Sequence, residues 1–273
     1  MDNILLHEYR IPVEGIKRKT IYHFSDTHLA EYDELATETE IAGAKKTTEA
    51  WERVRKIFAE THGEPIGEVQ MLPAKEHFEN LMNASKDGDA LIIAGDMFDY
   101  VSHPNMRVAE KAFKDYPCPI IALCGNHENP DNIPDGLLVS AMKSPIQTLE
   151  FEDLIILGLD DSKREISEEQ YSALETAYGS GKKVLLAMHI PIMAEENMEA
   201  LKKAGVYFQL NYDGCPERNL KFIELINANA DKTVAVLCGH LHFTNNTYIA
   251  NGLMQYVSTQ GVTGNLNKYI IGE

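Results

Sequence analysis

The stretch Ala90-Leu91-Ile92-Ile93-Ala94-Gly95-Asp96-Met97-Phe98-Asp99 decides the fold class of this chain. Its first five residues are all apolar, which is typical of a strand buried on both faces of a sheet. The stretch then turns polar, with a glycine followed by two aspartates. Open α/β sheets place their functional sites at the carboxyl ends of strands, so this stretch predicts both a central strand and a site beside it.

Similar short apolar runs recur along the chain and alternate with helical patterns, as in an α/β domain. We predict further strands at residues 20–25, 119–124, 154–159, 183–188 and 233–238, and a hairpin through Asn251-Gly252 that joins strands 246–250 and 253–259. Helical patterns cover residues 47–61, 74–85, 105–115 and 195–204. Ser167 should begin another helix through a capping box with Gln170, and Pro216 should mark the first turn of the last one.

The length of 273 residues fits one domain, which we assign to residues 1–273. The interval between the first two predicted strands is long, and two interpretations stay open for residues 31–88: a helical lid, or ordinary crossover helices with a surface excursion. Residues 1–19 carry scattered charges and no long apolar stretch, so we expect a cytoplasmic protein without membrane contact.

The composition disfavours one class of binding partner. The formal net charge of −17 disfavours extended nucleic acid as a partner, because most of the surface would repel a polyanion. Bound divalent cations would still make a local site positive. The four cysteines lack C-x-x-C spacing, which indicates reduced structural thiols.

Five of the predicted strands are followed by side chains that bind metals. In chain order these are Asp26-Thr27-His28, Gly95-Asp96-Met97-Phe98-Asp99, Gly125-Asn126-His127-Glu128, His189 and Gly239-His240-Leu241-His242. Each piece alone is common in loops, and a histidine after an apolar run is usually structural. The H-x-H pair is more specific, because alternate residues of an extended segment share a face.

Taken in order, these motifs resemble those of the calcineurin-like metallophosphoesterase family over nearly the whole chain. The resemblance implies an α/β fold in which two mixed β-sheets pack as a sandwich flanked by α-helices, with two divalent metal ions at the strand ends. It also implies a set of ligands: Asp26, His28 and His242 for one metal, Asn126, His189 and His240 for the other, and Asp96 bridging both.

Mixed nitrogen and oxygen ligands suit Mn, Fe or Zn, and the identity of the metals stays open. Two such cations about 3.5 to 4 Å apart share a hydroxide and aim it at phosphorus for in-line attack. The resemblance further implies that His127 is catalytic and protonates the leaving oxygen. Asp99 would orient the imidazole of His127 and favour its cationic form. Asn126 and His127 are then also candidate substrate-binding residues. A turn-capping role for Asp99 stays the alternative.

The substrate class is narrowed by neighbouring residues. Tyr100 follows Asp99 where the serine/threonine phosphatase branch has arginine, which argues against that branch. The first three motifs resemble the DNA-repair nuclease branch, whereas residues 158–191 resemble bacterial phosphodiesterases of the cyclic-nucleotide type. We expect a small-molecule or nucleotide phosphodiesterase, with monoesterase activity open. The alternatives are a DNA nuclease and a non-catalytic protein-binding scaffold, although a scaffold typically lacks part of the metal set or the catalytic histidine.

Overall fold

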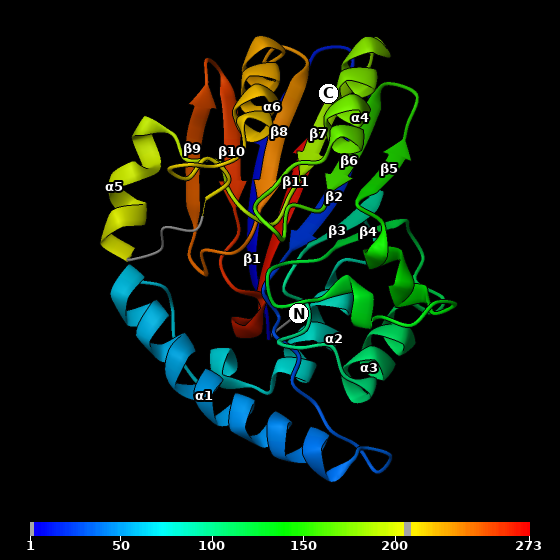
Figure 1. The fold of residues 1–273 in the computed structure, drawn as a ribbon, viewed down its shortest axis with the longest axis vertical. Coiled ribbons are helices and arrows are strands. Elements are labelled where there is room, and N and C mark those ends of the chain that lie inside the picture. Colours follow the sequence, from blue (N-terminus) through cyan, green and yellow to red (C-terminus); the bar gives the residue numbers. More distant parts are fainter. Residues whose placement is uncertain (1–2, 205–208) are drawn as a thin grey trace.

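The computed structural model describes residues 3–204 and 209–273. In this part of the chain two mixed β-sheets pack face to face, with helices on the outer faces (Figure 1). One sheet has five strands in the order β1-β11-β2-β3-β4, and the other has six in the order β5-β6-β7-β8-β10-β9. The predicted sandwich of two mixed sheets flanked by helices is confirmed.

Three parallel strands form one side of the first sheet. The strands of this sheet are β1 (Leu5–Ile11), β11 (Asn265–Ile271), β2 (Lys19–Phe24), β3 (Ala90–Ala94) and β4 (Ile120–Leu123). β2, β3 and β4 run parallel, β11 is antiparallel to β2, and β1 is parallel to β11. The carboxyl ends of β2, β3 and β4 therefore meet at one edge of the sheet.

The second sheet repeats this arrangement. Its strands are β5 (Ile146–Glu150), β6 (Leu154–Leu159), β7 (Lys183–Ala187), β8 (Thr233–Cys238), β10 (Leu253–Val257) and β9 (Asn245–Ala250). β6, β7, β8 and β10 are parallel neighbours, and the edge strands β5 and β9 are antiparallel to theirs. The predicted hairpin through Asn251-Gly252 is confirmed, with Gly252 at φ 76° in the left-handed region that the turn needs.

The helices are α1 (Glu38–His62), α2 (Ala74–Ala84), α3 (His103–Phe113), α4 (Glu168–Gly179), α5 (Glu195–Ala204) and α6 (Glu217–Ala228), with short 3-10 turns η1 (Val69–Met71), η2 (Pro130–Asn132), η3 (Leu138–Lys143) and η4 (Gly261–Thr263). α2 and α3 bury their apolar faces on the first sheet, and α4 and α6 on the second. The capping box between Ser167 and Gln170 is confirmed, and Pro216 is the N-cap of α6, one residue before its first turn.

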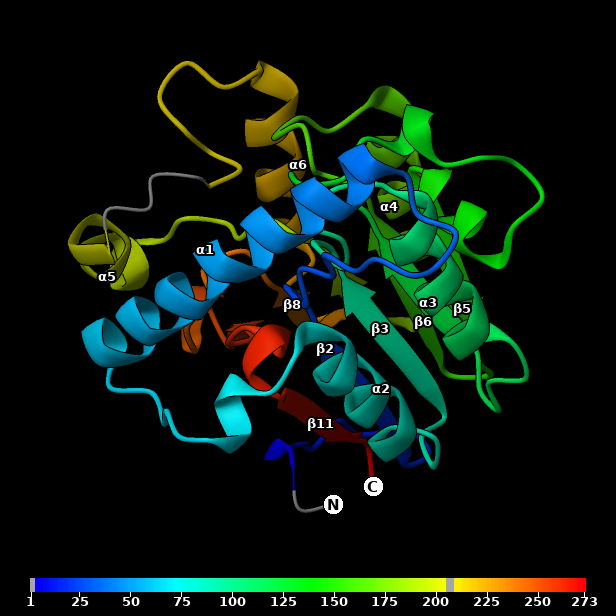
Figure 2. The same cartoon turned by 90° about the horizontal axis from the view of Figure 1, so that it is seen from below.

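The predicted long interval contains α1 and α2. α2 packs on the first sheet as an ordinary crossover helix does. α1 instead runs across the end of the sandwich, as Figure 2 shows. It begins with a capping box between Thr37 and Glu40 and ends at His62, with Gly63 as its C-cap. In the described residues, no helix combines the length and the apolar character needed to cross a membrane.

The inward faces of the two sheets form an apolar layer that also contains a histidine. Ile92, Leu185 and Leu237 are fully buried there. His23 on β2 is also fully buried, 6.1 Å from the Tyr269 ring, and its two ring nitrogens make no hydrogen bond within the described residues. Burial disfavours the charged imidazole and lowers the pKa of His23 from 6.5 to about 3, although Asp26 opposes this shift.

This histidine should make the fold acid-sensitive. Because the unfolded chain binds a proton near pH 6.5 and the folded one only near pH 3, folding free energy is lost as the pH falls through that window. Between pH 7.5 and pH 5 the loss from His23 should be about 2 kcal/mol. Urea unfolding of the metal-free protein at both pH values should show His23→Leu losing less stability than wild type by this amount. Equal losses would mean that His23 is not buried as a neutral ring.

Candidate metal centre

The five sequence motifs meet at one end of the sandwich. Loops after β2, β3 and β4 reach this point from the first sheet, and loops after β7 and β8 reach it from the second. The structure brings together all seven residues predicted as ligands: Asp26, His28, Asp96, Asn126, His189, His240 and His242. They form two clusters that share Asp96.

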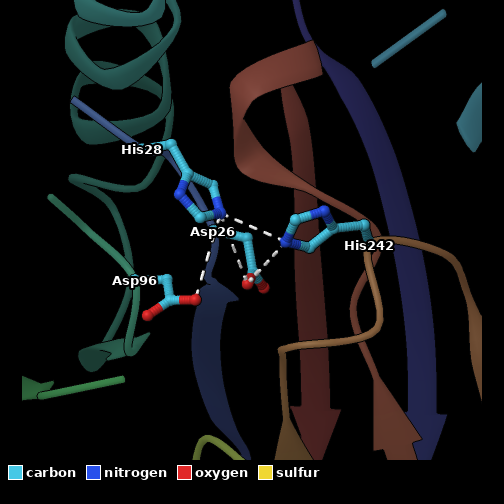
Figure 3. Close-up of side chains that lie close together, drawn as sticks. All are labelled: Asp26, His28, Asp96 and His242. Atoms are coloured by element: carbon cyan, nitrogen blue, oxygen red, sulfur yellow. Dashed lines mark hydrogen bonds and ion pairs between the residues drawn. The ribbon is translucent and has the colours of Figure 1, made fainter. Parts of the chain in front are cut away.

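The first cluster comprises Asp26, His28, His242 and Asp96 (Figure 3). Nε2 of His28 lies 3.1 Å from Nε2 of His242, which lies 3.3 Å from Oδ1 of Asp26. Oδ2 of Asp96 is 4.0 Å from Nε2 of His28. Neighbouring atoms that share one metal at bond lengths of about 2.1 Å lie roughly 3 to 3.5 Å apart, so the two distances from His242 suit a single first-row cation, whereas Asp96 lies somewhat further from His28.

The second cluster is built around His189. Its Nε2 atom lies 3.3 Å from Oδ2 of Asp96 and 3.2 Å from Oδ1 of Asn126, and His240 also presents a ring nitrogen to this group. Nδ1 of His189 lies 2.7 Å from the carbonyl oxygen of Ala94 and donates its hydrogen there. This bond leaves the lone pair of Nε2 directed at the cluster, which is how second-sphere carbonyls orient metal-binding histidines.

Asp96 lies between the clusters and uses its two oxygens differently. Oδ1 accepts the backbone N–H of His127 at 2.9 Å, which fixes the side chain. Oδ2 faces both His28 and His189. Burial opposes its charge, but the two histidines outweigh this effect and hold the pKa of Asp96 well below its ordinary value.

Unsatisfied polar atoms test whether a cation fits this site. Oδ1 of Asp26 is buried and receives no hydrogen bond from the described residues. Nδ1 of His28 lies 3.2 Å from Oδ1 of Asp99 and donates to it, so Nε2 of His28 carries a lone pair toward His242. A buried carboxylate oxygen beside an imidazole lone pair is costly without a bound cation, and this donor set fits a transition metal.

The backbone at the ligands is unusual. Five of the candidate ligands have positive φ: Asp26 at 56°, His28 at 43°, Asp96 at 48°, His240 at 73° and His242 at 62°. Such conformations are unfavourable for side chains with a Cβ and gather at functional sites. The neighbouring glycines make the close approach feasible, because a Cβ on Gly125 would lie 2.2 Å from Oδ1 of Asp96.

Glu128 and Asp161 are buried acids to which the sequence analysis assigned no role. Glu128 accepts the backbone N–H groups of Gly125 and Phe98, each at 2.7 Å, and so joins the loops after β3 and β4. Asp161 accepts the N–H of His189 at 2.9 Å. Burial raises the pKa of Glu128 to about 8 and that of Asp161 to about 7. In the sequence, Glu128 could have been found as the last residue of the G-N-H-E motif, and Asp161 as a polar residue that follows β6.

His127 lies at the open side of the centre. The side chains of Asn126 and His127 are exposed, whereas Asp96 and His189 are buried. Nδ1 of His127 lies 3.1 Å from the backbone oxygen of Asp99 and 3.3 Å from its Oδ1. Burial alone would lower the pKa of His127, but the contacts with Asp99 outweigh it and raise the pKa to about 9 in the metal-free protein. The structure therefore places Asp99 against two imidazoles, those of His127 and His28, where the sequence analysis assigned it one.

A sandwich of two mixed sheets with this donor set at one end is the architecture of metal-dependent phosphoesterases. The sequence profile of the calcineurin-like phosphoesterases matches residues 19–250, and the chain belongs to this family. No curated relative matches the sequence.

Three solved structures are similar to this chain, and the first of them supports the fold assignment. A dimetal phosphatase from Danio rerio superimposes with a TM-score of 0.51 at 12% identity, covering 90% of this chain and 88% of the other. A purple acid phosphatase from yellow lupin (Lupinus luteus) seeds is also similar, at 13% identity and a TM-score of 0.47 over 91% of this chain and 44% of the other. A phosphopantetheinyl hydrolase from Mycobacterium tuberculosis gives a TM-score of 0.43 at 11% identity, over 89% of this chain and 90% of the other.

Proposed function

We propose that the protein is a dinuclear-metal phosphoesterase that hydrolyses phosphodiester bonds of a small molecule or nucleotide. The observation that carries this proposal is the pair of ligand clusters that share Asp96, beside an exposed His127. Bound Mn, Fe or Zn ions would supply Lewis acidity and concentrated positive charge for phosphoryl transfer.

The roles of the residues follow from their positions. Asp26, His28 and His242 would hold one cation and Asn126, His189 and His240 the other, with Asp96 shared by the two clusters. His127 donates a proton from Nε2 to the leaving oxygen, because its Nδ1 is engaged by Asp99. Asn126 and His127 also contact the substrate, since their side chains are exposed where the buried ligands are not.

Charge supports a small substrate. A net charge of −17 makes long polyanions poor partners, whereas a nucleotide-sized ester needs only the local positive charge of two cations and His127. The acidic charge therefore favours a phosphodiesterase of small molecules over a DNA nuclease. Assays of metal-loaded protein on cyclic nucleotides, nucleotide monoesters, dinucleotides and single-stranded DNA distinguish the two.

Metal removal tests the proposal directly. Elemental analysis should find two transition metals per chain, because the ligands form two clusters. Chelation should abolish hydrolysis of an activated phosphodiester, and adding Mn²⁺ back should restore it. The mechanism is wrong if fully metal-free protein retains its hydrolytic rate.

A further inference from the structure

Helix α1 brings an aromatic residue against the centre. Trp51, the one tryptophan of the chain, donates its indole Nε1–H to Oδ1 of Asp99 at 2.8 Å. The indole ring also lies against the His28 ring, with centroids 4.0 Å apart and planes inclined by 31°. One side chain therefore touches a metal-ligand imidazole and the carboxylate that orients it.

The same carboxylate oxygen serves two histidines. Oδ1 of Asp99 is 3.2 Å from Nδ1 of His28 and 3.3 Å from Nδ1 of His127. The indole bond to this oxygen is shorter than either. As the shortest of the three contacts with this oxygen, the indole bond restrains where Oδ1 lies for both imidazoles.

Trp51 can impose this geometry because α1 is anchored on both sides of it. Arg55, one turn further on, is buried and donates through Nη1 to the carbonyl oxygens of Leu72 at 2.8 Å and Val262 at 3.2 Å. At the other end of the helix, Glu40 accepts from the ring and backbone of His103. The helix is tied both to η4 near the C-terminus and to the start of α3, so the indole is held from outside the ligand loops.

We propose that Trp51 is a positioning residue for the first metal cluster, fixing the ring of His28 by contact and the carboxylate of Asp99 by its N–H. This inference rests on the proposed function of the site. If so, residues 31–88 support the metal centre, because they include α1 and its Trp51. The contacts of Trp51 are with His28, Asp99 and, at a centroid distance of 5.3 Å, His242, all of which belong to the first cluster or orient it.

Calorimetric Mn²⁺ titration of the metal-free protein tests this inference. Trp51→Phe keeps a ring beside His28 and removes the N–H, so the affinity of the first cluster should fall about 10- to 100-fold, as for other second-sphere losses. The second affinity should change by less than about twofold, because among the described residues Trp51 contacts His28, His242 and Asp99, on the side of the first cluster. The same Mn²⁺ titration of His242→Ala, which removes a residue of the first cluster only, identifies which affinity belongs to that cluster. Ile57→Ala, an exposed change on the same helix, is the matched control and should alter neither affinity.

A double-mutant cycle separates positioning from general loss of packing. In an Asp99→Ala background Trp51→Phe should have no further effect on the first affinity, because its acceptor is gone. Equal affinities in Trp51→Phe and wild type, an equal fall at both clusters, or additive effects in the cycle would each overturn the inference. These results are independent of hydrolysis. Wild type that binds two metals but hydrolyses none of the tested esters would contradict only the proposed function.

Discussion

Replacing Asp96 by asparagine should abolish activity and lower the occupancy of both metals together. Oδ2 of Asp96 faces His28 of one cluster and His189 of the other, so the substitution removes a negative charge from between two cations. Loss of an orienting partner alone typically costs 10- to 100-fold, and a shared ligand should exceed that, so we expect kcat/KM to fall by more than about 100-fold. Elemental analysis and kinetics on the same sample measure both effects.

Two variants control this experiment. His242→Ala removes a ligand of the first cluster only, so it should lower one occupancy and spare the other. Asp131→Asn removes an exposed carboxylate from the loop that follows His127 and should change neither metal content nor rate. Asp96→Asn protein that still binds two metals tightly and turns over normally would disprove the shared role of Asp96.

Replacing His127 by alanine should leave both metals in place and slow hydrolysis according to the leaving group. An alkoxide needs a proton as the P–O bond breaks, whereas nitrophenolate departs well without one. We expect a loss of about 10²- to 10⁴-fold on an alkyl ester and a much smaller loss on a nitrophenyl ester. The decisive quantity is the ratio of kcat/KM between the two esters in wild type and variant.

Metal content must be checked in the same preparations, because the backbone N–H of His127 bonds to Asp96 and a shifted loop would mimic a catalytic defect. Asn129→Ala, an exposed substitution in the same loop, is a suitable comparison. Equal losses on both esters would mean that His127 mainly binds the phosphate or its developing charge, and the general-acid role would have to be withdrawn.

The buried parallel strands were predictable from sequence because their residues are apolar on both faces. The predictions for β3, β6 and β8 match the observed bounds, β7 differs by one residue at one end, and β2 and β4 differ by one residue at both ends. The packing of the strands as two mixed sheets came from the family resemblance, and the order of the strands within each sheet was not predicted. Periodicity carries no information on which strands pair.

The strands that were missed carry polar residues. β1 and β5 are edge strands of mixed exposure, so no apolar run marks them. β11 lies inside the first sheet but contains Asn265 and Asn267, residues that are typical of turns. Asn265 is buried because its side chain is hydrogen-bonded, with Oδ1 accepting from Nε2 of His7 on β1 at 2.8 Å. Tertiary hydrogen bonding of this kind has no local signature.

The candidate site likewise contains residues that were predictable from the sequence and one that was not. That the candidate ligands lie close together was predictable because each follows a strand within a few residues, and the carboxyl ends of parallel strands meet. Trp51 had no such signal, since its place beside His28 depends on the path of a 25-residue helix across the molecule. The start of that helix was predictable in principle, because Thr37 and Glu40 have the spacing of a capping box.

The positive φ angles in the loops that carry the candidate ligands also affect which substitutions are favoured there during evolution. Glycine adopts positive φ without cost, whereas valine, isoleucine and threonine are strongly disfavoured there. A lineage selected only for its fold would gain stability by acquiring glycine at these positions. Such glycines in a relative would therefore mark a descendant that has kept the sandwich and abandoned catalysis. This chain has none at the five positions concerned: Asp26, His28, Asp96, His240 and His242.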